Sequence, residues 1–307
     1  MHRFRLIAAL LTLLLLTSCS ASVPKDFTAE VLPSPSSEPP VLNVHMVDSG
    51  AVVRMDFETY LAGVVAGEMP NTWPIEALKA QAILARTFVL KFVTEKDSRY
   101  PGADISTDIA EAQAYNAGAV NERILTAVQE TAGQILLTQD GSLPWPWFHS
   151  HSGGRTETAR HGIDWQNEEP DYVRSTEGME ADTAPWSAHF TAAEFIAACR
   201  SAGAKVNTCN SVRIGQRGES GRAVTLLVDG EPVNAARLRI SLGSTKMRST
   251  LLTKLSTEGG VIRMSGLGYG HGVGLSQWGA HALAQRGWPA EEIALHYYKG
   301  LRVIKAW

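Results

Sequence analysis

The chain has 307 residues, a formal net charge of −3 at pH 7 and a hydrophobic fraction of 44%. This composition excludes a disordered acidic or basic protein, which could not bury enough apolar surface to offset its chain entropy. A near-neutral charge balance gives no basic face for nucleic acid, so we expect no nucleic-acid partner. The three cysteines lack C-x-x-C spacing, which excludes a zinc ribbon and a thioredoxin-like redox site. We expect one or two globular domains whose chemistry depends on oxygen and nitrogen groups.

Residues 1–20 have the pattern of a secretion signal. Two arginines precede an apolar run at residues 6–16, which is too short to span a bilayer comfortably. The run ends in the letters LTSC, which resemble the bacterial lipoprotein processing box, in which the cysteine is lipidated and becomes the mature N-terminus. An ordinary signal peptide with a stray cysteine is the alternative. We predict a signal peptide at residues 1–18, lipidation at Cys19 and an extracytoplasmic lipoprotein on the cell membrane, or on the outer membrane of a Gram-negative cell.

Residues 19–40 are rich in serine and proline and show no sustained apolar period, so we predict an extended tether. The folded part then spans residues 41–307. In an oxidising compartment its two cysteines, Cys199 and Cys209, could form a local disulfide. Two buried free thiols are the alternative.

The predicted elements of the folded part begin with two short strands around a turn signal at residues 48–50. An amphipathic helix is expected from residue 74 to about residue 96, with proline near its first position and Glu76 in its first turn. Two extended runs then flank a turn at residues 140–141.

Further along the chain, Thr191 and Glu194 form a capping box that predicts a short helix at residues 191–199. Two strands broken by residues 218–221 follow, and then come a glycine-rich segment and two C-terminal helices, at about residues 276–285 and 289–298. Strands and helices do not alternate regularly, so we predict an α+β fold with mixed sheets, packed helices and a substrate groove.

The first segment that carries chemistry reads YLAGVVAGEMP and contains Glu68. A carboxyl group beside small apolar residues is disfavoured in its charged form, so its pKa should rise toward a value suited to a general acid. A solvated surface glutamate before a turn is the alternative.

The second segment, FHSHSGGRTE, is rich in groups that hydrogen-bond polar substrates. His149 and His151 would face the same side of an extended strand and could ligate a metal, although zinc needs at least three protein ligands. A polar loop is the alternative.

The third segment, GLGYGHGVGLSQWGA, contains too many glycines for a regular helix or strand, so we predict a tight loop that passes close to another group. It is no dinucleotide fingerprint, because Val273 stands where the third glycine belongs, and no Gly-Lys-Ser/Thr follows as in a P-loop.

Together these segments resemble the SpoIID/LytB family of stage II sporulation protein D and the amidase-enhancer proteins. The matching blocks are YLAGVVAGEMP with EALKAQAILARTF, FHSHSGGRTE, GLGYGHGVGLSQWGAHALAQRG and HYYKG, and they extend over the folded part. The resemblance implies action on bacterial peptidoglycan, because the sporulation member is a lytic transglycosylase that cuts glycan strands stripped of stem peptides. The family's catalytic glutamate precedes Met-Pro in the first block, which is Glu68 here.

A lytic transglycosylase cleaves the bond between N-acetylmuramic acid and N-acetylglucosamine without water and forms a 1,6-anhydro ring. One carboxyl group can protonate the glycosidic oxygen and then, as a carboxylate, remove the proton of the muramyl 6-hydroxyl. Hydrolysis by two carboxylates would need a partner acid, for which Glu157 and Asp164 are candidates. We favour the route with Glu68 as the single acid/base.

The substrate-binding residues are predicted from the matching blocks and from their chemistry. They are Gln81, Arg86, His149, Ser150, Ser152, Tyr269, His271 and Gln277. Arg86 could bind an acidic lactyl group or orient Glu68, and a surface salt bridge is its alternative role. Tyr269 or Trp278 could stack on a sugar ring, with core packing as the alternative for Trp278, while Tyr297 and Tyr298 are expected to pack the final helix.

The sequence departs from the family in two respects. Some sporulation members hold a metal with histidine and cysteine near the second block, which contains no cysteine here, so we expect no cofactor. A lipoprotein box replaces the transmembrane segment of the sporulation protein, which suggests a general envelope role.

Two other functions stay open at this point. The protein could be a non-catalytic peptidoglycan-binding module that enhances a cell-wall amidase. It could also be a metallo-hydrolase built on His149, His151 and either His161 or His271.

Overall fold

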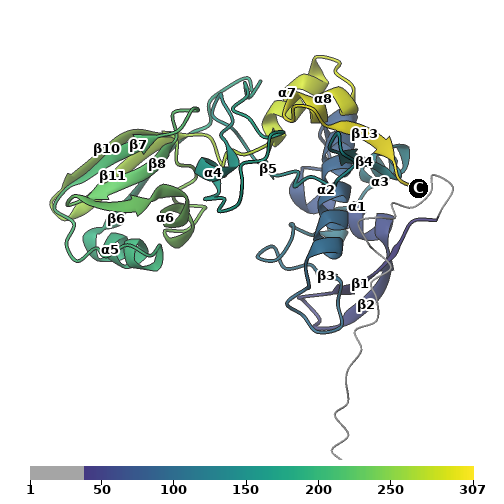
Figure 1. The fold of residues 1–307 in the computed structure, drawn as a ribbon, viewed down its shortest axis with the longest axis horizontal. Helices are drawn as coiled ribbons and strands as arrows, with labels where there is room; N and C mark the ends of the chain where they lie inside the picture. The colour runs from purple at the N-terminus through teal and green to yellow at the C-terminus, as the bar shows by residue number, and fades with distance from the viewer. Residues whose placement is uncertain (1–37) are drawn as a thin grey trace, which may run out of the picture.

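The computed structural model describes residues 38–307 and confirms the α+β class (Figure 1). The predicted signal peptide, Cys19 and most of the predicted tether lie outside the described residues. The described chain contains two hydrophobic cores, one among the helices and one in a β lobe that we define as residues 185–267. No helix within residues 38–307 is long and apolar enough to cross a bilayer.

The helical part begins with the predicted hairpin, in which β1 (Val41–His45) and β2 (Val52–Asp56) pair antiparallel. A third strand, β3 (Ile105–Ser106), adds to β1 in parallel. Helix α1 (Phe57–Glu68) follows β2 directly because Asp56 caps it, accepting a hydrogen bond from the backbone N–H of Thr59. The hairpin therefore fixes where α1 starts.

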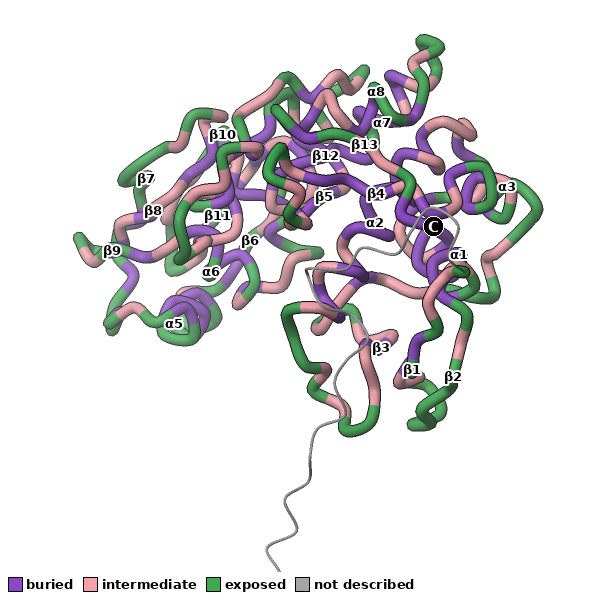
Figure 2. Tube along the Cα trace, turned by 45° about the vertical axis from the view of Figure 1, so that its right-hand side comes forward, coloured by how far each residue is buried: buried purple, intermediate pink, exposed green. Residues whose placement is uncertain are grey.

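Helix α2 (Ile75–Glu95) confirms the predicted long helix and is the centre of the helical core. It packs against four other helices: α1, α3 (Glu122–Glu130), α7 (Gln277–Gln285) and α8 (Ala290–His296). Figure 2 shows α1 and α2 buried along most of their length. The alanines of α2 leave room for these neighbours on several sides, so the helix is buried more fully than an amphipathic surface helix.

The β lobe contains two three-stranded sheets. One has the order β10 (Leu252–Glu258), β11 (Val261–Leu267), β6 (Pro185–Thr191), and the other the order β7 (Val212–Arg217), β8 (Ala223–Val228), β9 (Glu231–Asn234). Helices α5 (Ala192–Ser201) and α6 (Ala235–Ser241) pack on them. The capping box of Thr191 and Glu194 is confirmed at the start of α5.

The chain returns from the β lobe to the helices through the glycine-rich segment. There β12 (Leu275–Ser276) pairs in parallel with β5 (Phe148–His149), which lies on the path into the β lobe. The last strand, β13 (Arg302–Lys305), pairs antiparallel with β4 (Gln134–Leu137). Two short helices, η1 (Ala117–Ala119) and α4 (Ala159–Gly162), complete the described elements. The second and third motif blocks thus lie side by side where the two parts of the molecule meet.

Candidate active site

Glu68 is the last residue of α1 and lies where the helix stops. Met69 is in extended conformation and its N–H still donates to the carbonyl of Val65. Pro70 follows and has no N–H with which to continue the helix. The side chain of Glu68 is partly exposed, whereas most of α1 before it is buried. The helix end therefore presents one carboxyl group at the edge of the helical core.

Two groups from distant segments hold the carboxyl group of Glu68. The backbone N–H of Ala114 donates to Oε1 at 2.7 Å, and Nε2 of Gln277 donates to Oε2 over a longer distance of 3.4 Å. Burial raises the pKa of Glu68 from 4.5 to about 7, although both hydrogen bonds favour the carboxylate and lower the pKa. The carboxyl group can therefore carry or release a proton near neutral pH.

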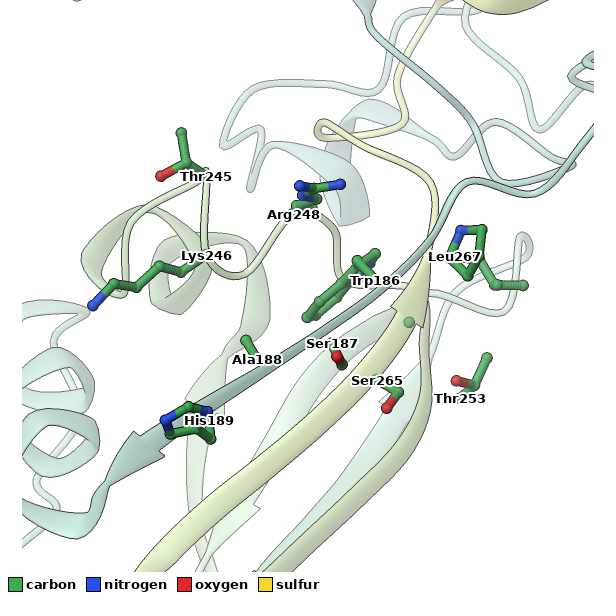
Figure 3. Close-up of a pocket in the computed structure, with 12 residues that line it drawn as sticks. Trp186, Ser187, Ala188, His189, Thr245, Lys246, Arg248, Thr253, Ser265 and Leu267 are labelled. Atoms are coloured by element: carbon green, nitrogen blue, oxygen red, sulfur yellow. The ribbon is translucent and has the colours of Figure 1, made fainter.

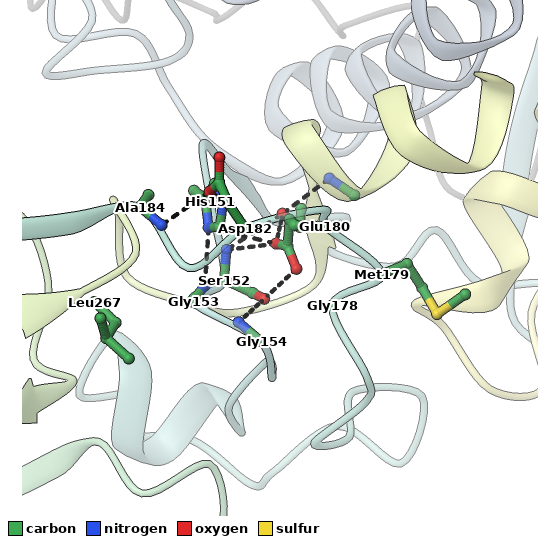
Figure 4. A network of polar contacts seen from close by, with 12 residues as sticks. His151, Ser152, Gly153, Gly154, Gly178, Met179, Glu180, Asp182, Ala184 and Leu267 are labelled. Atoms are coloured by element: carbon green, nitrogen blue, oxygen red, sulfur yellow. Dashed lines mark hydrogen bonds and ion pairs between the residues drawn. The ribbon is translucent and has the colours of Figure 1, made fainter.

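Gln277 reaches Glu68 because it is the first residue of α7. The side chain of Ser276 caps this helix by accepting from the backbone N–H of Gly279, and its hydroxyl donates to Glu180. Glu180 is buried and also accepts hydrogen bonds from the backbone N–H and the hydroxyl of Ser152, at 2.7 and 2.9 Å (Figure 4). The second motif block thus fixes the start of α7, which in turn places Gln277 beside the acid.

An aromatic cluster lies next to these groups. Trp73 follows Glu68 by five positions and its ring centroid is 4.8 Å from that of Trp278, which directly follows Gln277. His281 contacts both indoles. Trp278 is 44% exposed, so it is no core residue, and its indole offers an apolar face of the kind that packs against sugar rings.

The predicted residues of the second block have different environments. His149 is buried, and its Nδ1 bonds the carbonyl of Val273, while Nε2 has no partner among the described residues. Burial, with His271 and Arg222 nearby, places the pKa of His149 well below its usual range. Ser150 is partly exposed and its carbonyl accepts from the N–H of Trp278 at 3.0 Å. Ser150 thus lies against Trp278, the residue that follows Gln277.

Ser152 is fully buried and serves as the partner of Glu180 described above. Figure 4 shows His151 in the same network, where Nε2 contacts Asp182 at 2.9 Å and Nδ1 accepts from the N–H of Gly153. Because its side chain is enclosed, Ser152 does not face solvent as the substrate-binding prediction requires.

The glycine-rich block supplies Tyr269 and His271. Tyr269 is partly exposed, pairs through its backbone with His151, and has the guanidinium of Arg248 5.5 Å from its ring centroid. The ring centroid of His271 is 5.6 Å from that of His149. Desolvation, with Arg239 and Arg222 nearby, lowers the pKa of His271 to about 3, so its imidazole is neutral.

Two predicted substrate-binding residues are corrected by the structure. Arg86 is fully buried and forms a two-point ion pair with Glu58, at 2.8 and 3.0 Å, besides donating to the carbonyl of Gln134. Gln81 is also fully buried, and its amide has no partner among the described residues. Their positions on α2 face the helical core because neighbours cover that helix on several sides. Arg86 therefore forms a structural ion pair, as in its alternative role, but this pair is buried and does not lie at the surface.

The two candidates for a second catalytic carboxylate are engaged elsewhere. Glu157 is fully buried and accepts from the hydroxyl and the N–H of Ser220, at 2.6 and 3.1 Å. Asp164 binds Asn234 and Arg237 of the β lobe. Neither contacts Glu68, whose carboxyl group is instead bound by a backbone amide and a neutral side chain.

Cys199 and Cys209 are both buried, and both are free thiols rather than the disulfide that we considered. Burial raises the pKa of Cys199 to about 12. Among residues 38–307, no three histidine, cysteine or carboxylate side chains gather in a way that could hold a metal ion. Tyr297 and Tyr298 are buried against the helical core, as predicted.

A cavity of about 750 Å³ lies in the β lobe, between β6 and residues 245–248 (Figure 3). His189, Lys246 and Arg248 line it, and Trp186 forms part of its wall. It includes neither Glu68 nor the residues that bind it. We therefore identify the candidate active site by the carboxyl group of Glu68 and its hydrogen bonds, and not by this cavity.

Several residues that hold the site carried no signal in the sequence. Ala114 acts through its backbone N–H, a group that every residue except proline has. Glu180 and Asp182 lie outside all four matched blocks.

The fold is thus α+β, and the candidate site is built around the partly buried carboxyl group of Glu68 at the end of α1. The family model described as "Stage II sporulation protein", SpoIID, matches residues 47–137. Stage II sporulation protein D of Bacillus amyloliquefaciens is 30% identical over 291 residues, which cover 89% of this chain and 81% of that protein. The corresponding protein of Bacillus subtilis is 29% identical, over 88% of this chain and 80% of its own.

A further relative, the amidase enhancer of Bacillus subtilis, is 28% identical over 78% of this chain and 39% of its own length. The chain belongs to the SpoIID family. The resemblance drawn from the motif blocks is thereby confirmed.

Proposed function

We propose that this protein is a peptidoglycan lytic transglycosylase that cleaves MurNAc–GlcNAc strands with Glu68 as its acid/base. The observation that carries the proposal is the carboxyl group of Glu68 at the end of α1, which is partly exposed and has its pKa raised to about 7 by burial. A hydrolase with two carboxylates would need a second acid across the scissile bond. The two candidates for that acid, Glu157 and Asp164, bind Ser220 and residues of the β lobe.

In the proposed reaction, protonated Glu68 first gives its proton to the glycosidic oxygen as the bond to C1 of the muramyl residue breaks. The resulting carboxylate then takes the proton of the muramyl 6-hydroxyl as that oxygen bonds to C1, which closes the 1,6-anhydro ring. The proton is thus returned to Glu68. A pKa near 7 suits both steps, and the two hydrogen bonds would stabilise the carboxylate between them.

The surroundings of Glu68 support a glycan as substrate. The exposed face of Trp278 could pack against a sugar ring, and Ser150 and Gln277 supply hydrogen-bonding groups nearby. The preference for strands poor in stem peptides is carried over from the family resemblance.

The proposed location and partners rest on the N-terminal sequence and on a relative. We infer a lipid anchor at Cys19 and a folded part outside the cytoplasmic membrane, with peptidoglycan as partner. The relative named amidase enhancer suggests association with a cell-wall amidase. On that alternative the site would bind glycan without cutting it.

The test compares wild type with Glu68→Gln on purified glycan strands, intact and stripped by an amidase. Glutamine keeps the size and hydrogen bonding of glutamate but has no acidic proton, so the variant should bind strands and release no product. Products ending in anhydromuramic acid, detected by mass spectrometry with wild type alone, would support the proposal. Binding without cleavage by wild type on both substrates would favour the amidase-enhancing module.

A further inference from the structure

The segment that donates to Glu68 packs against two glycines of α1. Gly63 and Gly67 are four residues apart, so they share one side of the helix. Neither has a positive φ, so the helix itself would accept any residue except proline at either position. What requires glycine is space. A Cβ atom at Gly67 would lie 2.7 Å from the backbone of Ala114, and one at Gly63 would overlap the ring of Tyr115.

The segment 112–116 contacts α1 through three successive residues, 114 to 116. The N–H of Asn116 donates to the carbonyl of Gly63 at 2.9 Å, and the N–H of Ala114 donates to Oε1 of Glu68 at 2.7 Å. The ring of Tyr115 stacks on that of Tyr60, with centroids 5.5 Å apart. These three contacts run from the first turn of α1 to its end.

The flanks of the segment are also tied down. On one side, Glu111 accepts hydrogen bonds from the N–H of Arg99 and the hydroxyl of Ser98. On the other side, the side chain of Asn71 donates to the carbonyl of Ala119 at 2.7 Å. Asn71 lies three residues after Glu68, so the turn that follows the acid is bound to the segment that orients it.

We propose that segment 112–116 is a positioning element for Glu68, which holds the acid through the N–H of Ala114 and can do so only because Gly63 and Gly67 let it touch α1. This inference rests on the proposed function of Glu68. The shorter of the two hydrogen bonds to the carboxyl group comes from this segment, and the longer one comes from Gln277. Oε1 is therefore the oxygen with the fixed direction, and Oε2 is the oxygen left to exchange the proton with substrate.

Gly67→Ala is the direct test, because a methyl group there must push the backbone of Ala114 away from the helix. Losing a hydrogen bond to a carboxylate raises its pKa, by about one unit or more. The Glu68 carboxyl group is titrated by ¹³C NMR in protein labelled at glutamate side chains, with its signal assigned by its absence in Glu68→Gln. We expect the titration midpoint to move up by about one pH unit in Gly67→Ala.

The activity of the same variant gives a second readout. A displaced acid should lower kcat by about tenfold or more and leave KM within about twofold, because glycan contacts outside the carboxyl group persist. The alkaline limb of the pH profile should move in the same direction as the NMR midpoint. Gly118→Ala is the matched control. Gly118 lies two residues after the segment, and a Cβ there would make only an ordinary contact of 3.5 Å with the side chain of Asn116.

Gly63→Ala keeps the proposal testable if Gly67→Ala fails to fold. The added methyl group meets the side chain of Tyr115 and not the backbone, so its effect on the midpoint should be reversed by adding Tyr115→Ala. An unchanged NMR midpoint in folded Gly67→Ala, or in Gly63→Ala, overturns the positioning role whatever the activity. Activity retained by Glu68→Gln would instead overturn the proposed function, and the NMR titration would still decide the role of the segment.

Discussion

Glu68→Gln should stabilise the protein at neutral and alkaline pH, although it removes the proposed catalytic group. Folding raises the pKa of Glu68 from 4.5 to about 7, so the folded state binds this proton more tightly than the unfolded state does. The stability that this proton contributes is complete below about pH 4.5 and is lost as the pH rises to about 7. One pKa unit corresponds to about 1.4 kcal/mol, so the free energy of unfolding of wild type falls by about 3 kcal/mol over this range. Glutamine does not titrate, so the variant does not lose this stability.

The assay is urea unfolding of wild type and Glu68→Gln at pH 4.5 and pH 8. The difference in free energy of unfolding should move by about 3 kcal/mol in favour of the variant between the two conditions. Glu219→Gln, in an exposed loop, is the matched control and should change the difference by no more than about 0.5 kcal/mol. A difference between wild type and Glu68→Gln that is independent of pH would refute the reasoning, because Glu68 would then titrate alike in both states.

Three further predictions follow from contacts in and around the site. Arg86→Met leaves Glu58 without its buried partner and should lower the free energy of unfolding by about 3 kcal/mol in a urea titration; a loss below about 1 kcal/mol would mean that the pair is a minor contact. Ser276→Ala removes the cap of α7 and should lower the free energy of unfolding by about 1 kcal/mol in the same titration. It should also lower kcat, because the start of α7 places Gln277, and an unaltered free energy of unfolding and kcat would contradict this. Trp278→Ala should weaken binding of glycan strands in a pull-down by up to about tenfold while Trp278→Tyr retains it, and equal binding by all three proteins would exclude a stacking role.

Local patterns predicted the fold well where the deciding interactions are themselves local. The hairpin at β1 and β2, the long helix α2 and the capping box of α5 each depend on residues within one element or one turn. The helix α1 was not among the predicted elements, because its small apolar residues read equally well as a buried strand. The division into two hydrophobic cores could not be predicted from the sequence either, because the strands of both cores have similar apolar patterns.

The candidate site could be located in the sequence by Glu68 and Gln277, but not by the backbone group that binds Glu68. Glu68 and Gln277 lie in two recognisable blocks, and the structure brings their side chains together across 209 positions. Ala114, which lies 46 positions from Glu68, was not predicted because it acts through its backbone N–H. Arg86 shows the opposite error: its motif suggested a binding role, and its partner Glu58, 28 positions away, makes it a buried ion pair. Sequence spacing on α2 placed both Arg86 and Gln81 correctly on the helix but could not tell which of its sides are covered.

The proposed reaction uses no water, so digestion of stripped glycan strands in H₂¹⁸O tests it most directly. If Glu68 transfers the proton and the muramyl 6-hydroxyl attacks C1, the products contain no ¹⁸O and end in the 1,6-anhydro ring, and Glu68→Gln yields none of them. Reducing ends that carry one ¹⁸O atom would contradict the account, because they would require water as the nucleophile and a second group to activate it.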